Sequence, residues 1–298
     1  MKQLLLFALI FGFVAVADAQ LKPAPAKTVI FAVLNDGKAI EPIGYIGAKG
    51  VMTAAIDGAS ESAILAAFHR TYFAKAKMFP LVFGGKVSGT VTVTSSNPRG
   101  ECVNYMASVT TKTTRSALKG NIMALATNAK ITKPGSGVRR LPTPAERAEI
   151  EALVRDTFVK DGISAEVAKN LKYHNLTALD VNSDGQAEMV GSFWVEPVAT
   201  ERQLLFFIAE LGSDKKYRFG YAENRRVKQE EVMSEDIKDL DTGVYHERLL
   251  DIFDVDGDSD SEIFSYVMSF EGAGFNVYKR QGDGWVMHFE GSNYHCGY

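Results

Sequence analysis

The alternation of apolar and polar residues predicts strands along most of the first half of the chain, residues 1–142. The segment TVIFAVL, residues 28–34, is rich in the β-branched and aromatic residues typical of strands. Apolar residues within 61–77 recur at helical spacing, which allows one amphipathic helix. Four further segments have strand character and are bounded by Gly or Asn-Pro: FPLVFGG, KVSGTVTVTSS, ECVNYMASVTT and NIMALATNAKI.

The second half, residues 143–298, opens with a clear helix signal. Thr143 is a suitable N-cap, Pro144 suits the first turn and Glu146 completes a T-x-x-E capping box. Ser164 begins a second, shorter helix. The apolar stripe expected on the first helix consists of Ile150, Leu153, Val154 and Phe158.

Strand-like segments fill the rest of the second half, and their order repeats. The succession strand, acidic loop, strand, strand, strand occurs twice, with Leu176 recurring as Leu250 and Glu188 as Glu262 at a constant spacing. The expected fold class is therefore mainly β with a few helices. It combines an N-terminal β domain with a C-terminal antiparallel domain of two four-stranded meander repeats, each with one hairpin loop rich in oxygen donors.

The charge distribution supports two units. Residues 1–142 contain 17 Lys and Arg against 6 Asp and Glu, whereas the second half contains 16 against 30. The Pro, Gly and Ser residues of 131–142 are typical of a linker. We therefore predict a basic mainly-β domain over 20–130, this linker, and an acidic helix-plus-β domain over 143–298.

The N-terminal residues predict export. Lys2 precedes an uninterrupted apolar run over 4–16, and Ala17-Asp18-Ala19 fits a cleavage site. The run is shorter than the roughly 20 residues that span a bilayer. We therefore expect 1–19 to be a cleaved signal peptide and the mature protein to be secreted or periplasmic, without a transmembrane segment.

Export bears on the two cysteines, Cys102 and Cys296. They could form a disulfide in an oxidising compartment, or remain two separate buried thiols. A bridge would tie the first half of the chain to its C-terminus.

The first acidic loop, called loop one here, has the pattern D-x-N-x-D-G-x-x-E. Alternate side chains of such a turn converge on one point, and hard oxygen donors suit Ca²⁺. Position 7 would contribute its backbone carbonyl. The candidate ligands are Asp180, Asn182, Asp184, Gln186 and Glu188.

Loop one differs from an EF-hand. The bidentate Glu of an EF-hand belongs at position 12, where this chain has Gly191, and the flanking segments are expected to be strands. With its acid at position 9, Glu188, the loop resembles the β-hairpin calcium loops of FG-GAP and VCBS-type repeats, including the integrin-like propellers. The resemblance covers the loops and their flanking strands in the second half only, and it implies bound Ca²⁺.

The second acidic loop, called loop two, has acids in the same register. It departs from the pattern at position 6, where Ser259 replaces Gly and a left-handed conformation would be strained by roughly 1–2 kcal/mol. Loop two is therefore expected to bind Ca²⁺ more weakly or to turn differently. Its candidate ligands are Asp254, Asp256, Asp258, Asp260 and Glu262.

The sequence contains no zinc-protease pattern, nucleophile elbow, P-loop or dinucleotide fingerprint. A calcium-stabilised, non-enzymatic binding or structural protein is the expected function. A carbohydrate-binding or adhesion module and a secreted hydrolase with an unrecognised site are the alternatives. The candidate partners of the basic first half are a glycan, an envelope polymer or the acidic second half, and a solvated basic surface without a partner is the alternative. Nucleic acid is disfavoured as a partner because export is predicted and the basic residues are scattered.

Overall fold

The computed structural model describes residues 26–56, 62–100, 102, 105–114, 118–120, 122–131 and 134–296. The predicted signal peptide, 1–19, lies outside the described residues. Within them, no helix has the length and apolar character needed to cross a membrane. The chain is mainly β, as predicted.

The strands of the first half form one antiparallel sheet that closes on itself. Its order is β1-β7-β4-β5-β6-β2-β3, and β1 also pairs with β2, so six strands complete a small barrel from which β3 extends. The strands are β1 (Thr28–Leu34), β2 (Ala39–Ile46), β3 (Met52–Thr53), β4 (Met78–Phe83), β5 (Lys86–Ser96), β6 (Ala107–Thr113) and β7 (Ala124–Thr127).

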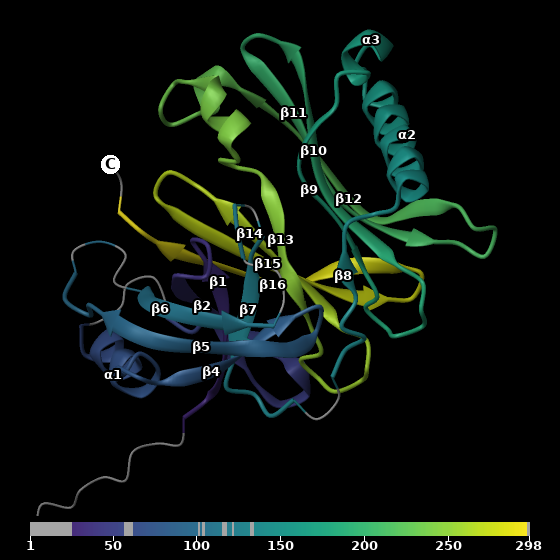
Figure 1. Cartoon of the computed structure of the whole chain (residues 1–298). Coiled ribbons are helices and arrows are strands. Elements are labelled where there is room, and N and C mark those ends of the chain that lie inside the picture. The colour runs from purple at the N-terminus through teal and green to yellow at the C-terminus, as the bar shows by residue number, and fades with distance from the viewer. Residues whose placement is uncertain are drawn as a thin grey trace, which may run out of the picture.

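Helix α1 (Ser62–Tyr72) packs against the core of this barrel (Figure 1). Phe68 and Tyr72 of α1 meet Phe31 of β1, with ring centroids 6.4 Å apart in each pair. Successive residues of a strand point to opposite faces. Val29, Phe31 and Val33 therefore face this core, while the residues between them face the second half.

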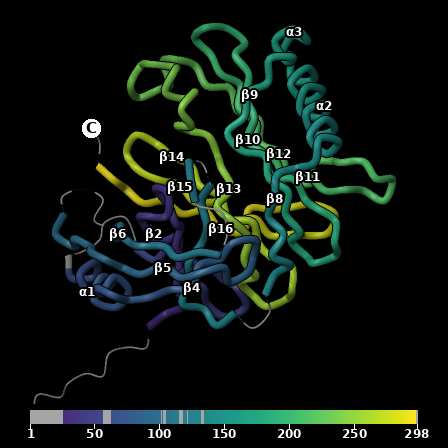
Figure 2. Tube along the Cα trace, viewed as in Figure 1, coloured from purple at the N-terminus to yellow at the C-terminus, as the bar shows by residue number. Residues whose placement is uncertain are grey.

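Two antiparallel meanders make up the second half, as predicted. The first contains β9 (Lys172–Leu179), β10 (Glu188–Val198), β11 (Glu201–Leu211) and β12 (Tyr217–Lys228); the second contains β13 (Glu247–Phe253), β14 (Glu262–Met268), β15 (Gly272–Gln281) and β16 (Gly284–Tyr294). The two-residue strand β8 (Arg139–Arg140) lies alongside β9 and extends the first meander to five strands (Figure 2). Short 3-10 turns, η2 (Gln229–Glu231) and η3 (Ile237–Thr242), connect the meanders.

Helix α2 (Pro144–Lys160) begins as the sequence predicts. Thr143 Oγ1 accepts from the N–H of Glu146 at 3.3 Å, and Glu146 Oε2 accepts from the N–H of Thr143 at 2.7 Å, which completes the capping box. The buried residues of α2 are Ile150, Val154 and Phe158. They pack on one face of the first meander together with α3 (Ala165–Ala168).

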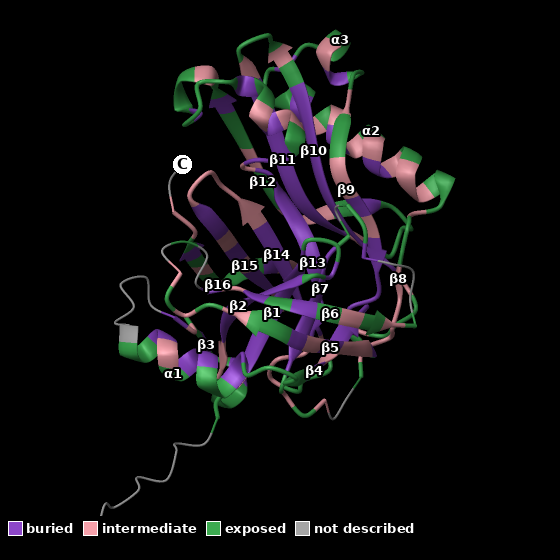
Figure 3. Ribbon diagram, turned by 60° about the vertical axis from the view of Figure 1, so that its left-hand side comes forward, coloured by how far each residue is buried: buried purple, intermediate pink, exposed green. Residues whose placement is uncertain are grey.

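The layers are stacked in the order α2, first meander, second meander, barrel. The opposite face of the first meander packs on the second meander through residues such as Val190, Ile208 and Ile263. The remaining face of the second meander packs on the barrel, where Ile30 and Leu125 share a core with Phe264. Buried strands run through this contact between the halves (Figure 3).

The described part of the segment predicted as a linker is bonded to both halves. Gly135 and Gly137 donate to the carbonyls of Gly85 and Gly84, at 3.0 Å each. On the other side, Ser136 Oγ donates to the carbonyl of Asp180 at 2.8 Å. The segment therefore joins the turn between β4 and β5 to loop one.

A buried ion pair lies at the same junction. Asp251 of β13 is fully buried and accepts from Arg139 Nη1 at 3.0 Å. Its two carboxylate oxygens also accept from the N–H of Gly84, at 2.9 and 3.0 Å. Three segments far apart in the sequence thus meet on one carboxylate.

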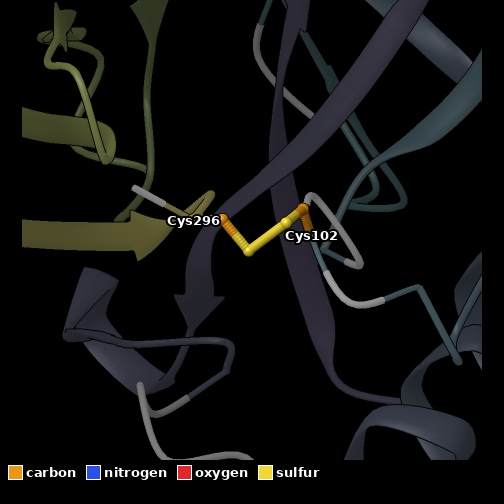
Figure 4. Close-up of a disulfide and its surroundings, with 2 residues drawn as sticks. All are labelled: Cys102 and Cys296. Carbon is orange, nitrogen blue, oxygen red and sulfur yellow. A yellow bond between two sulfur atoms is a disulfide. The ribbon is translucent and has the colours of Figure 1, made fainter. Parts of the chain in front are cut away.

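Cys102 and Cys296 form a disulfide, with their Cα atoms 5.3 Å apart and a sequence separation of 194 (Figure 4). Of the two possibilities left open by the sequence, the structure has the bridge. It fastens the C-terminal end of the chain, which follows β16, to the first half.

Candidate metal centre

Loop one and loop two occupy the same place in their meanders. Loop one joins β9 to β10 and loop two joins β13 to β14. Glu188 and Glu262 begin the second strand of their hairpins, where they pair with Leu179 and Phe253. The sequence repeat therefore corresponds to a structural repeat of strand, acidic loop and strand.

The same hydrogen bonds close both loops. At position 2, the N–H of Val181 donates to Glu188 Oε2 at 3.0 Å, and the N–H of Val255 donates to Glu262 Oε2 at 2.9 Å. The position 1 carboxylates, Asp180 and Asp254, accept from the N–H of position 6 at 3.3 and 3.1 Å. Carboxylates from the two ends of each loop thus fold it into a single turn.

The side chains at positions 3 and 5 also bend back onto the loop. In loop one Asn182 Oδ1 accepts from the N–H of position 5 at 3.1 Å, and the equivalent bond of loop two is 3.2 Å. The position 5 carboxylates accept from the N–H of Gln186 at 2.7 Å and of Asp260 at 2.9 Å. Side-chain oxygens of positions 1, 3, 5 and 9 therefore gather around one turn in both loops.

Both loops are left-handed at positions 4 and 6. Loop one has Ser183 at φ 60° and Gly185 at φ 81°; loop two has Gly257 at φ 83° and Ser259 at φ 86°. Each loop therefore has one Gly and one Ser at these two positions, in opposite order. Ser259 does not make loop two turn differently, so that part of the sequence-based expectation is wrong. The weaker binding of Ca²⁺ by loop two stays a prediction.

Loop one contains a buried oxygen that no donor of the described residues reaches. Asp180 is 5% exposed, and its Oδ1 accepts no hydrogen bond from the described residues. Burial raises the pKa of Glu188 to about 7, and the nearby carboxylates of Asp184 and Glu210 add to the rise. A divalent cation would satisfy the Asp180 oxygen and favour the charged form of Glu188, so the oxygen donors of loop one fit Ca²⁺.

Loop two contains a cation of its own. The ligand oxygens of Asp254, Asp256 and Asp258 all lie within 4.8 Å of one another. Lys279 of β15 reaches this group: its Nζ contacts Asp256 and lies 3.0 Å from Asp258 Oδ2. Burial acts to lower the pKa of Lys279, but its hydrogen bonds to the two aspartates outweigh that and raise the pKa. The side chain is therefore an ammonium.

A cavity of about 180 Å³ with both polar and apolar lining residues lies between the two meanders. Glu247 at its wall is buried and accepts from Tyr278 OH at 2.7 Å. His246 is 1% exposed, and burial lowers its pKa to about 2, with electrostatic interactions with His174 and Arg248 adding to the decrease. Other polar residues of the lining are Ser192, Glu223, Arg225, Asn276 and Glu290.

Sequence reasoning identified the loops but missed Lys279 and the cavity. Both depend on contacts between strands, and neither lies in a motif. No protein-family model, curated protein or solved structure matches the chain. The resemblance to FG-GAP and VCBS-type loops therefore stays a prediction.

Proposed function

We propose that this protein is an exported, calcium-stabilised binding or structural protein without catalytic activity, in which Ca²⁺ bound by loop one braces the stacked sheets. The observation that carries the proposal is the buried Oδ1 of Asp180, which accepts no hydrogen bond from the described residues and lies in a turn of oxygen donors. An unsatisfied buried acceptor costs about 1–3 kcal/mol, more when charged. Ca²⁺, which prefers six to eight oxygen ligands, would remove that cost.

The position of loop one explains why a brace there would matter. The carbonyl of Asp180 accepts from Ser136, and the carbonyl of Val181 accepts from the N–H of Ser261 in loop two at 2.9 Å. Loop one therefore contacts the segment between the halves and the second meander. A cation that fixes its conformation would stabilise the contacts on both sides.

The glutamates of the two loops accept hydrogen bonds from backbone N–H groups. Glu188 and Glu262 each accept from an N–H across the loop and are almost fully buried. A catalytic acid–base pair has to reach a substrate. This enclosure favours a structural use of these acids over a hydrolytic one.

Thermal unfolding with and without Ca²⁺ tests the proposal. We expect Ca²⁺ to raise the Tm and a chelator to lower it, with a gain of about 2.7 kcal/mol at a hundredfold excess over Kd. The control is Asp214→Asn, which changes an exposed carboxylate outside the loops. A Tm that does not respond to either reagent would contradict the proposal.

A carbohydrate-binding role is the second candidate, and the cavity between the meanders favours it. Acceptors and donors such as Glu223, Arg225 and Asn276 line it beside the aromatic Tyr245, a combination suited to hydroxyl-rich ligands. A glycan array with the wild type and Asn276→Leu tests this role. Binding that Asn276→Leu abolishes would support it, and an array without signal would reject it.

A further inference from the structure

We infer that Lys279 replaces the divalent cation in loop two, so that, of the two acidic loops, loop one is a calcium site and loop two is closed by its own ammonium group. The inference about loop one rests on the proposed function. The inference about loop two rests on the contacts of Lys279 alone.

The Lys279 ammonium lies among the oxygens that would otherwise hold a metal. Its Nζ contacts the position 3 carboxylate, Asp256, and lies 3.0 Å from Asp258 Oδ2 and 3.4 Å from Glu262 Oε1, at positions 5 and 9. Calcium binds such oxygens at about 2.3–2.6 Å. The ammonium group and a Ca²⁺ ion would therefore bind the same oxygens, and only one of them can do so at a time.

The strand register shows that the two repeats differ at this point. Met189 pairs with Ala209 in the first meander, and Ile263 pairs with Tyr278 in the second. One residue nearer the loop, the strand beside position 9 has Glu210 in the first repeat and Lys279 in the second. The same place therefore has an acid beside loop one and a base beside loop two.

Among the described residues, no Lys or Arg forms an ion pair with the carboxylates of loop one, although the charge of Arg280 acts on Asp184 from nearby. Glu210 is bonded to Arg280 at 3.0 Å and to Trp285 Nε1 at 2.9 Å, and the Asp180 carboxylate stays 95% buried with an unpartnered Oδ1. Lys215 reaches only the amide oxygen of Gln186, at 3.1 Å. Lys279 of loop two therefore has no counterpart bonded to the carboxylates of loop one among the described residues.

Lys279 also reduces the negative charge of loop two without a metal. Five acids alone would repel one another, and Lys279 offsets part of that repulsion through three of them. To admit Ca²⁺, the Lys279 side chain, which is 28% exposed, would have to leave these carboxylates for solvent. Calcium binding to loop two therefore competes with an intramolecular ion pair.

Counting bound calcium by native mass spectrometry tests the inference. Wild-type protein titrated with Ca²⁺ is expected to bind one ion, and Lys279→Met is expected to bind two. Lys279→Arg keeps the positive charge and should bind one ion. Lys215→Met, which removes a lysine near loop one that contacts no carboxylate of the loop, should also bind one.

The outcomes test the role of Lys279 and the calcium site in loop one separately. Two ions on the wild type, or no additional ion on Lys279→Met, would overturn the role of Lys279. No ion on the wild type with one on Lys279→Met would support that role and contradict the calcium site in loop one. Should Lys279→Met unfold without metal, calcium-dependent refolding followed by circular dichroism would support the inference. A variant that stays unfolded in Ca²⁺ while Lys279→Arg folds without it would overturn the inference.

Discussion

Two serines hold left-handed backbone conformations in the acidic loops. Ser183 occupies position 4 of loop one and Ser259 position 6 of loop two, while Gly fills the other left-handed position of each loop. A non-Gly residue in this conformation costs roughly 1–2 kcal/mol. Each loop therefore contains strain at one of its two left-handed positions.

We expect Ser259→Gly to raise the free energy of unfolding by about 1 kcal/mol, because it removes this strain. Gly257→Ala should lower it by about the same amount, and only through backbone strain, since no atom lies within 4 Å of the added Cβ. Urea unfolding measures both. A neutral or destabilising Ser259→Gly would contradict the assigned strain.

The buried His246 predicts a pH dependence of stability. Its folded-state pKa of about 2 lies far below the ordinary value, so the unfolded chain binds a proton that the folded protein does not. The contribution of His246 to the free energy of unfolding is present above about pH 6.5. It is lost as the pH falls, by about 1.4 kcal/mol per pH unit. We expect His246→Phe to unfold with a shallower loss of stability between pH 6.5 and 5 than the wild type. Equal slopes would contradict this role of His246.

The sequence predicts the helices and strands whose formation depends on neighbouring residues in the chain. The capping box at Thr143 and the strands on either side of both loops follow from neighbouring residues, and the structure has them. The strand β2 was missed because Pro42 and Gly44 interrupt AIEPIGYI, and it exists because it closes the barrel between β1 and β6. Tertiary pairing here overrides local propensity.

The candidate site was predicted only in part for the same reason. The spacing of the acids identified each loop, but the cation beside loop two comes from β15, two strands later. The repeat spacing does not reveal Lys279, because the connections between the paired strands differ in length. Glu210 and Lys279 become equivalent only through strand register.

We expect Asp251→Ala to lower the free energy of unfolding by about 3–5 kcal/mol, because it leaves Arg139 and the N–H of Gly84 buried without their partner. Glu166→Ala removes an exposed ion pair with Lys169 and should have little effect. Urea unfolding compares the two variants. A loss from Asp251→Ala as small as that from Glu166→Ala would show that this junction is not important for stability.

At the scale of the whole molecule, a shared core and a disulfide join the first half of the chain to the second. The barrel and the second meander share a core, and the disulfide ties the C-terminal end to the first half. The two halves that charge and composition separate in the sequence are therefore in direct contact in the fold.

We expect the paired variant Cys102→Ser and Cys296→Ser to lose roughly 5 kcal/mol of stability, because the bridge joins residues with a sequence separation of 194 and restricts the unfolded chain. Denaturant unfolding of the oxidised wild type and the variant measures the difference. Equal stabilities, or a wild type in which both thiols react with an alkylating reagent without reduction, would contradict the bridge.

The most direct test of the central claim is a Ca²⁺ titration by isothermal calorimetry on the wild type, Asp180→Asn and Asp254→Asn. These variants change the same position in the two loops. The account predicts one site in the wild type, loss of that site in Asp180→Asn and its retention in Asp254→Asn. Calcium binding that survives Asp180→Asn, or that Asp254→Asn abolishes, would contradict a calcium site in loop one.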